Sequence, residues 1–99
     1  MAPGEVSLSV NDIPIQIEYF VQRFIGNTIA GMLDTLDGTG EIETLELSVD
    51  RDEVTINLNN ALVPINPFVS EIIRNTITGM VSSLKGVSEI NKVNINIKE

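Results

Sequence analysis

Four carboxylates lie close together in the segment from Asp34 to Glu43, around Gly38 and Gly40. Oxygen ligands at a glycine-rich bend are what Ca²⁺ binds in proteins. The spacing, however, does not fit the calcium-loop pattern D-x-[DN]-x-[DN]-G. The second half of the chain places serine, lysine and asparagine at three of the four corresponding positions. We therefore interpret the segment as a solvated helix end and turn, and we predict no metal site.

Acid–base chemistry needs carboxylates whose pKa is shifted by burial. Glu41, Glu43 and Glu46 are close enough in sequence to pair, but they fall in a predicted exposed loop or on the outer face of a predicted strand. The chain has no histidine and no cysteine, which removes the usual general base and the thiolate nucleophile. We expect no catalytic residue and no cofactor, and we expect that the protein is not an enzyme.

Other chemistries are equally poorly supported. Three serines on the predicted strands have no histidine or suitably placed lysine to activate them: Ser7, Ser9 and Ser48. The glycines of residues 38–40 end a predicted helix instead of opening one, which is the wrong end for binding phosphate.

Readers of single-stranded RNA stack bases on aromatic side chains of a sheet. Here all four aromatic residues, Tyr19, Phe20, Phe24 and Phe68, fall at predicted helix positions. Phe20 and Phe68 are expected in the hydrophobic core.

A stripe of small and polar residues recurs on the two predicted helices. It comprises Asn27, Thr28, Gly31 and Thr35 in the first half, and Asn75, Thr76, Gly79 and Ser83 in the second. A glycine inside a helix costs about 0.5–1 kcal/mol relative to alanine. Its presence in both helices predicts close backbone approach, where the helices cross or lie tightly on the sheet. The alternative is a small polar pocket that binds a ligand. Arg23 and Glu71 occupy equivalent positions and would form an ion pair if the axis between the halves passed near them.

The elements that position these residues come in two similar sets. Residues 5–50 align on residues 53–98 without a gap, a shift of 48. Identical pairs include Val6 with Val54, Leu36 with Leu84, and Gly38 with Gly86. The alignment predicts a single domain, residues 1–99, made of two tandem repeats (5–50 and 53–98) related by a pseudo-two-fold axis.

Each repeat opens with alternating apolar residues, which predicts a half-buried strand. Pairs of residues that tolerate positive φ follow, Asn11 with Asp12 and Asn59 with Asn60, and they predict tight hairpin turns. Proline in the short return segments predicts edge strands.

A helical period of apolar residues then runs from Ile17 to Leu36 and from Ile65 to Leu84, predicting two amphipathic helices of about five turns. Asn66 and Pro67 form an N-terminal cap, Glu18 is a poorer one, and Gly38 and Gly86 are expected to stop the helices. A strand closes each repeat. The pattern indicates an α+β two-layer sandwich of ferredoxin-like kind, β-α-β/β-α-β, with a short extra strand before each helix.

Composition narrows the function classes. The net charge is −8, all of it in residues 1–52, whereas residues 53–99 are neutral. An acidic surface repels nucleic acid and anionic lipid, so we expect neither partner. Solubility is the simpler explanation of the acids, and a basic partner or cation is the alternative. The N-terminus lacks the features of a signal peptide, and no apolar run is long enough to span a bilayer. We therefore expect a cytoplasmic protein.

The segments Asn66–Val69, Asn75–Met80 and Ser83–Val87, which read NPFV, NTITGM and SLKGV, resemble a segment of small archaeal and bacterial proteins of unassigned function. In those proteins a hairpin precedes one helix and one strand. The resemblance covers residues 54–97 well and residues 6–49 more loosely. It implies no activity, and it implies that single-copy relatives pair as dimers and that this chain is a fused pair.

Two functions remain open. The favoured hypothesis is a non-enzymatic protein-interaction or structural module that associates with itself or with a protein partner, with exposed edge strands as the expected contact. The alternative is a regulatory domain that binds a small ligand, at a pocket near Asn27 or Asn75.

Overall fold

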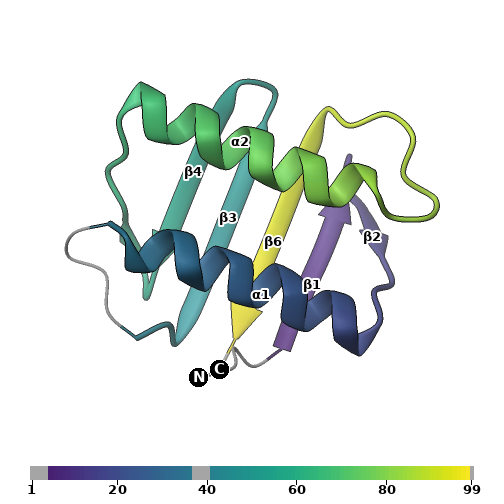
Figure 1. The fold of residues 1–99 in the computed structure, drawn as a ribbon, viewed down its shortest axis with the longest axis horizontal. Helices are drawn as coiled ribbons and strands as arrows, with labels where there is room; N and C mark the ends of the chain where they lie inside the picture. Colours follow the sequence, from purple (N-terminus) through teal and green to yellow (C-terminus); the bar gives the residue numbers. More distant parts are fainter. Residues whose placement is uncertain (1–4, 37–40, 99) are drawn as a thin grey trace.

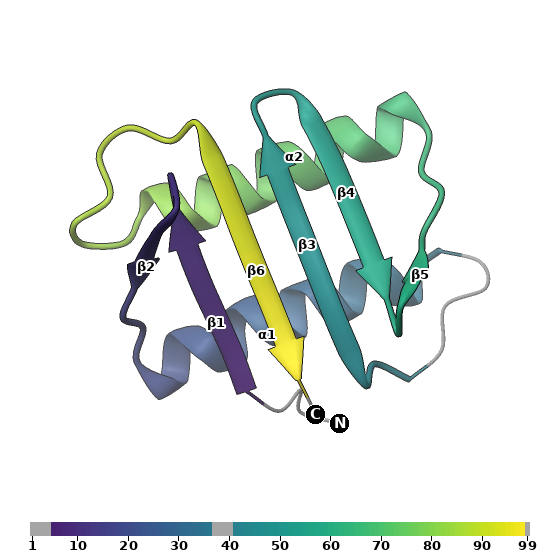
Figure 2. The ribbon, with the colours of Figure 1, turned by 180° about the vertical axis from the view of Figure 1, so that it is seen from behind.

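The computed structural model describes residues 5–36 and 41–98. They form a mixed α+β fold of two helices and a six-stranded antiparallel sheet. The strands are β1 (Glu5–Val10), β2 (Ile13–Ile15), β3 (Thr44–Asp50), β4 (Glu53–Leu58), β5 (Ala61–Leu62) and β6 (Lys92–Lys98). The helices are α1 (Tyr19–Asp34) and α2 (Pro67–Ser82). Both helices lie on one face of the sheet and run side by side in opposite directions (Figure 1). The other face is not covered by any described element (Figure 2).

The sheet order is β2-β1-β6-β3-β4-β5. The short strands β2 and β5 therefore lie at the two edges, as the proline positions predicted. Each helix joins two parallel strands with one strand of the other half between them: β6 lies between β1 and β3, and β3 lies between β4 and β6. This is a split β-α-β unit, and neither half has a contiguous sheet without the other.

The element bounds of the first half recur 48 residues later. The bounds of β1, α1 and β3 match those of β4, α2 and β6 residue for residue, and only β5 is one residue shorter than β2. In the central β3–β6 pair, Leu47 lies opposite Ile95, its own counterpart. An axis normal to the sheet between these two residues therefore relates the two sets of elements.

The hairpin turns follow from residues that adopt positive φ. Asn11 and Asp12 have φ of 52° and 66°, and Asn59 and Asn60 have φ of 51° and 67°. Positive φ at both central residues is the geometry of a type I′ turn, whose twist matches that of the flanking strands.

The helix caps differ between the halves. The side chain of Asn66 accepts a hydrogen bond from the backbone N–H of Val69 at 2.8 Å, and Pro67 occupies the first turn of α2. Glu18 makes no capping hydrogen bond with its side chain. The helices are shorter than predicted: α2 ends at Ser82, and Gly86, with φ of 83°, lies in the following turn instead of stopping the helix. Gly38 lies outside the described residues.

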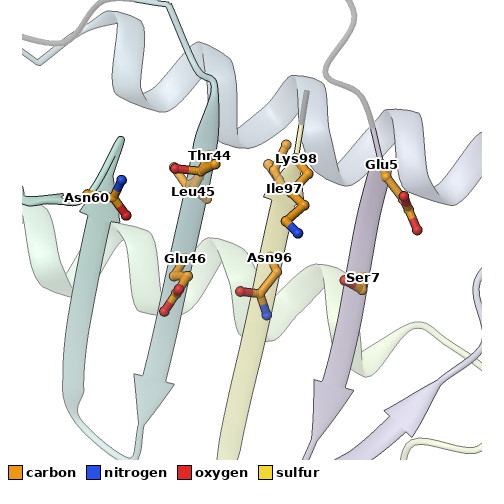
Figure 3. A pocket seen from close by; sticks show the side chains of 9 residues that line it. All are labelled: Glu5, Ser7, Thr44, Leu45, Glu46, Asn60, Asn96, Ile97 and Lys98. Atoms are coloured by element: carbon orange, nitrogen blue, oxygen red, sulfur yellow. The ribbon is translucent and has the colours of Figure 1, made fainter.

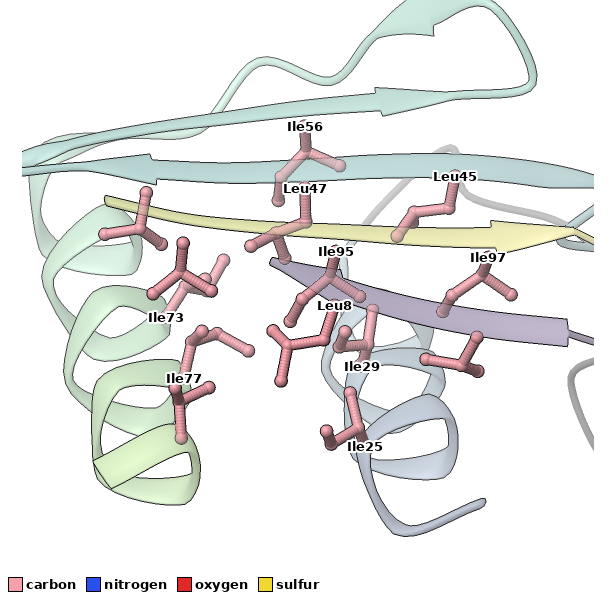
Figure 4. Packing of buried hydrophobic residues seen from close by; sticks show 14 of the residues in the cluster. Leu8, Ile25, Ile29, Leu45, Leu47, Ile56, Ile73, Ile77, Ile95 and Ile97 are labelled. Carbon is pink, nitrogen blue, oxygen red and sulfur yellow. The ribbon is translucent and has the colours of Figure 1, made fainter. Parts of the chain in front are cut away.

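The core fills the space between the helices and the sheet (Figure 4). It consists of buried aliphatic residues from both helices and the four long strands. Ile29, Ile56, Ile77 and Ile95 have no exposed surface. No polar or charged side chain of the described residues is buried.

Candidate functional site

The surface of α1 and α2 that faces away from the sheet carries large exposed apolar side chains. Each helix buries one apolar row against the sheet, including Ile25 and Ile29 in α1 and Ile73 and Ile77 in α2. A second apolar row lies on the outer side: Phe20 is 71% exposed, Phe24 54%, Phe68 71% and Ile72 46%. We call this surface of the two helices the helical face.

The positions of Phe20 and Phe68 correct the prediction that both lie in the core. The predicted apolar stripe of each helix is broader than the strip that the sheet covers, so its outer members remain in solvent. The rings of Phe20 and Phe24, one helical turn apart, lie with their centroids 6.0 Å from each other.

Two hollows lie between the helices. The first, of about 430 Å³, is lined on the α1 side by Phe20, Val21, Phe24 and Ile25, and on the α2 side by Gly79, Met80, Ser83 and Leu84. The second, of about 440 Å³, is lined by Val69, Ile72 and Ile73 and by Thr28, Gly31, Met32, Thr35 and Leu36. Most residues of one hollow have their counterparts, 48 residues away, in the other, and none of the lining residues carries a charge.

The predicted stripe of small residues therefore lies partly in these hollows. A Cβ atom added at Gly31 or Gly79 would meet no atom within 4 Å. Close backbone approach, which the sequence favoured as the reason for both glycines, is thus absent. Instead, each glycine leaves an open floor opposite the large side chains of the other helix.

The polar members of the stripe are hydrogen-bonded locally. The hydroxyl groups of Thr28 and Thr76 donate to the backbone carbonyls of Phe24 and Ile72, each at 2.7 Å. Asn27 and Asn75 are exposed and line neither hollow. Few polar groups are therefore directed into the hollows.

The other face of the sheet holds a shallow polar hollow at the end of β6 (Figure 3). Glu46, Asn96 and Lys98 lie along it, with Ser7 on the neighbouring strand. Glu41, Glu43 and Glu46 are all exposed, and they lie in a loop or at the sheet surface, as predicted. Ser9 and Ser48 are half-buried on the same face.

Part of the acidic segment, residues 37–40, lies outside the described residues. Within the described ranges no group of three or more acidic, histidine or cysteine side chains is placed to hold a metal ion. Arg23 lies over the ring of Tyr19, 5.9 Å from its centroid, instead of pairing with Glu71.

Two asparagine side chains have a role that the sequence did not reveal. The side-chain oxygen of Asn59 accepts hydrogen bonds from the backbone N–H groups of Glu43 (2.8 Å) and Thr44 (3.0 Å), and its amide donates to the carbonyl of Glu41 (2.8 Å). Asn11 bonds to the backbone of Glu89, Asn91 and Lys92 in the same way. We call Asn11 and Asn59 the hairpin clamps, because each one fixes the loop that leads from a helix into a central strand. The partners of Asn11 are about 80 residues away, so no local pattern marks this contact.

In the part of the chain that the structure describes, no helix has the length and apolar character needed to cross a membrane. Comparison of the chain with protein-family models, with curated proteins and with solved structures finds no match.

Proposed function

We propose that this chain is a non-enzymatic protein-interaction module whose contact surface is the helical face. One observation carries the proposal: the exposed side chains of Phe20, Phe24 and Ile72 line two uncharged hollows. Phe68, one helical turn before Ile72, is exposed as well. Contiguous apolar surface of this kind is typical of interaction sites, and aromatic side chains supply much of the binding energy at such sites.

The helical face is a better candidate than the sheet edges, which the sequence favoured. The edge strands β2 and β5 are three and two residues long, so they offer few unpaired backbone groups to an incoming strand. Pro14, inside β2, has no N–H to donate. Ile13 and Leu62 are exposed on these strands, and they provide a matched comparison for the helical face.

We also propose that the chain is a tandem duplication, the fused pair that the resemblance implies. The matching element bounds and the Leu47–Ile95 pairing support this origin. A relation to ferredoxin-like folds is supported by the split β-α-β units. Against it, the last strand of each half lies at the centre of this sheet, where a ferredoxin-like sheet has the first strands.

A catalytic role has little support. Every charged side chain of the described residues is at least partly exposed, whereas catalytic acids and bases usually depend on burial for a shifted pKa. That the protein is not an enzyme stays a prediction.

The test compares two double variants of equal chemistry. Phe20→Asp with Phe68→Asp places charges on the helical face, and Ile13→Asp with Leu62→Asp places them on the edge strands. Both proteins are used beside the unchanged chain in light scattering and in affinity capture from the source cell. The proposal expects association to be lost only in the helical-face variant, and loss only in the edge variant would overturn it.

A small-ligand-binding domain is the second candidate, favoured by the size of the two hollows. Ligand sites usually measure about 300–1,000 Å³, but they combine apolar walls with a few convergent polar groups. Here the hydroxyls of Thr28, Thr35 and Ser83 donate to backbone carbonyls of their own helices. A ligand of these hollows would therefore be apolar. A thermal-shift screen with hydrophobic metabolites checks this, because a ligand that binds the folded state raises the melting temperature.

A further inference from the structure

We infer that the occupant of the helical face is a second copy of this chain, stacked face to face to form a four-layer sheet–helix–helix–sheet dimer. The inference rests on the proposed function and adds the identity of the partner. In this dimer, the exposed phenylalanines of each copy lie over the glycine floor of a hollow in the other.

The arrangement of large and small residues on the helical face is self-complementary. Phe20 and Phe24 lie near the start of α1, across the first hollow from Gly79. Ile72, near the start of α2, lies across the second hollow from Gly31. Because the helices are antiparallel (Figure 1), the large residues lie at two diagonally opposite corners of the face, and the two glycines lie at the other two corners. A two-fold axis in the plane of the face, along or across the groove, places each corner of one copy over a neighbouring corner of the other. Each large residue of one copy then meets a glycine of the other.

The charge distribution permits two copies to meet at this surface. Each copy carries a net charge of −8, so contact between acidic surfaces would be opposed by repulsion. No charged residue lines either hollow. The charged residues within the two helices, Arg23, Asp34, Glu71 and Arg74, are two basic and two acidic, so their charges sum to zero. Asp52 pairs with Arg74 of α2 at 4.0 Å, and Glu5 and Glu46 line the hollow on the uncovered sheet face. A strongly basic partner, by contrast, would find little to bind on the helical face.

The exposed apolar side chains supply a large part of the area that a stable dimer needs. A helix of 16 residues is about 24 Å long, and two helices side by side are about 20 Å wide. A fully exposed aromatic side chain contributes about 150–250 Å², so the exposed parts of the three phenylalanines alone supply about 400 Å². The half-buried Met32, Met80, Leu36 and Leu84 extend this surface. The three phenylalanines thus supply about half of the roughly 800 Å² that each partner contributes to a standard interface, and these half-buried side chains supply part of the rest.

Two registers satisfy this pairing. If the dimer axis runs along the groove between the helices, α1 lies on α2 of the partner and Phe20 meets Gly79. If the axis runs across the groove, α1 lies on α1 of the partner and Phe20 meets Gly31. Because the two halves are nearly symmetric, both arrangements place similar side chains in contact. Cross-linking between the two copies distinguishes them.

The first experiment measures the mass of the purified full-length chain by light scattering and sedimentation at micromolar concentrations and above. We expect a dimer, and we expect Phe20→Asp with Phe68→Asp to weaken dimerisation by about tenfold or more, because truncation of a central anchor typically costs more than 1 kcal/mol. The control, Ile13→Asp with Leu62→Asp, keeps the dimer. Circular dichroism verifies that both variants fold, as expected for residues that are more than half exposed.

The second experiment uses the absence of cysteine from the chain. Single-cysteine variants Phe20→Cys, Gly79→Cys and Gly31→Cys are mixed in pairs under mild oxidation, with Ile13→Cys and Leu62→Cys as the control pair. A disulfide needs Cα atoms within about 7 Å, so rapid cross-linking of Phe20→Cys with Gly79→Cys or with Gly31→Cys identifies the register. No cross-link in either pair, or equally fast cross-linking of the control pair, overturns the face-to-face dimer.

The outcomes separate the inference from the function on which it rests. A chain that stays monomeric, but captures another protein only while Phe20 and Phe68 are intact, overturns the second copy as occupant and leaves the interaction module standing. A monomer whose capture of partners ignores the helical face overturns both.

Discussion

The two halves of the chain build the same elements with different surfaces. Almost every buried residue of residues 5–50 has a buried apolar counterpart 48 positions later, such as Ile25 with Ile73 and Leu47 with Ile95. The charges do not match: residues 1–52 carry the entire net charge of −8, and residues 53–99 are neutral. The acids of the first half that the structure describes are exposed. The comparison teaches that packing constrains the core positions of both halves equally, whereas the outer positions can differ without changing the elements.

The largest expected effect tests whether the two halves contribute equally to the shared core. Ile29→Ala and Ile77→Ala each remove a side chain with no exposed surface, and each is expected to lower the free energy of unfolding by about 2–5 kcal/mol. Urea denaturation measures both values. Similar losses support one shared core, and a small loss at only one site would show that the halves are packed differently.

The hairpin clamps provide the next test. Asn59→Gly keeps the positive φ but removes three hydrogen bonds to the backbone of residues 41–44, and we expect a loss of about 1–3 kcal/mol. Asn60→Gly is the matched control, because Asn60 has a similar φ and its side chain makes no hydrogen bond within the described part of the chain.

The same substitution at Asn11, with its clamp on residues 89–92, sharpens the comparison between the halves. Equal losses for Asn11→Gly and Asn59→Gly are expected in chemical denaturation. If the control Asn60→Gly were as destabilising as Asn59→Gly, the turn geometry and not the clamp would be responsible.

The helix caps are a place where the halves differ. Asn66→Ala is expected to destabilise the protein by about 1 kcal/mol, because it removes the bond to the Val69 N–H. Glu18→Asn places the same residue at a position with similar backbone angles, φ −72° and ψ 162° against −84° and 169°. Thermal denaturation measures the free energy of unfolding of both variants. If Glu18→Asn gains about as much stability as Asn66→Ala loses, then the first half lacks only the capping side chain. A gain of zero would contradict this.

The smallest effect concerns an ion pair between the halves that has no counterpart at the equivalent positions. Asp12 lies 3.2 Å from the Nζ of Lys92, and the corresponding residues, Asn60 and Thr44, cannot form such a pair. Both partners are partly exposed, so Asp12→Asn is expected to cost at most about 1 kcal/mol. Unfolding measured at low and high salt checks this, because the difference between wild type and variant should shrink as salt screens the pair.

Periodicity and turn chemistry were sufficient to predict the α+β class, the edge position of β2 and β5, the positive φ of Asn11 and Asn59, and the cap at Asn66. Each of these follows from residues near one another in the sequence. Periodicity did not show which side of a broad apolar stripe meets the sheet, and for this reason the exposure of Phe20 and Phe68 was missed.

The glycines of the helical face were misinterpreted for a related reason. A glycine at a repeated position indicates that space is needed above the backbone, but it does not say whether that space is filled within the chain. Gly31 and Gly79 are open in the structure. The clamps of Asn11 and Asn59 join segments far apart in sequence, so they became visible only once the sheet register was known.

The interleaved order of the strands has a consequence for folding. Because β6 lies between β1 and β3, and β3 lies between β4 and β6, each half must insert a strand into the other before either helix has a continuous sheet beneath it. Cleavage in the hairpin of residues 50–53 should therefore give two fragments that are disordered alone and regain structure only when mixed. Complementation of this kind would show that each half of the chain folds only by binding the other half.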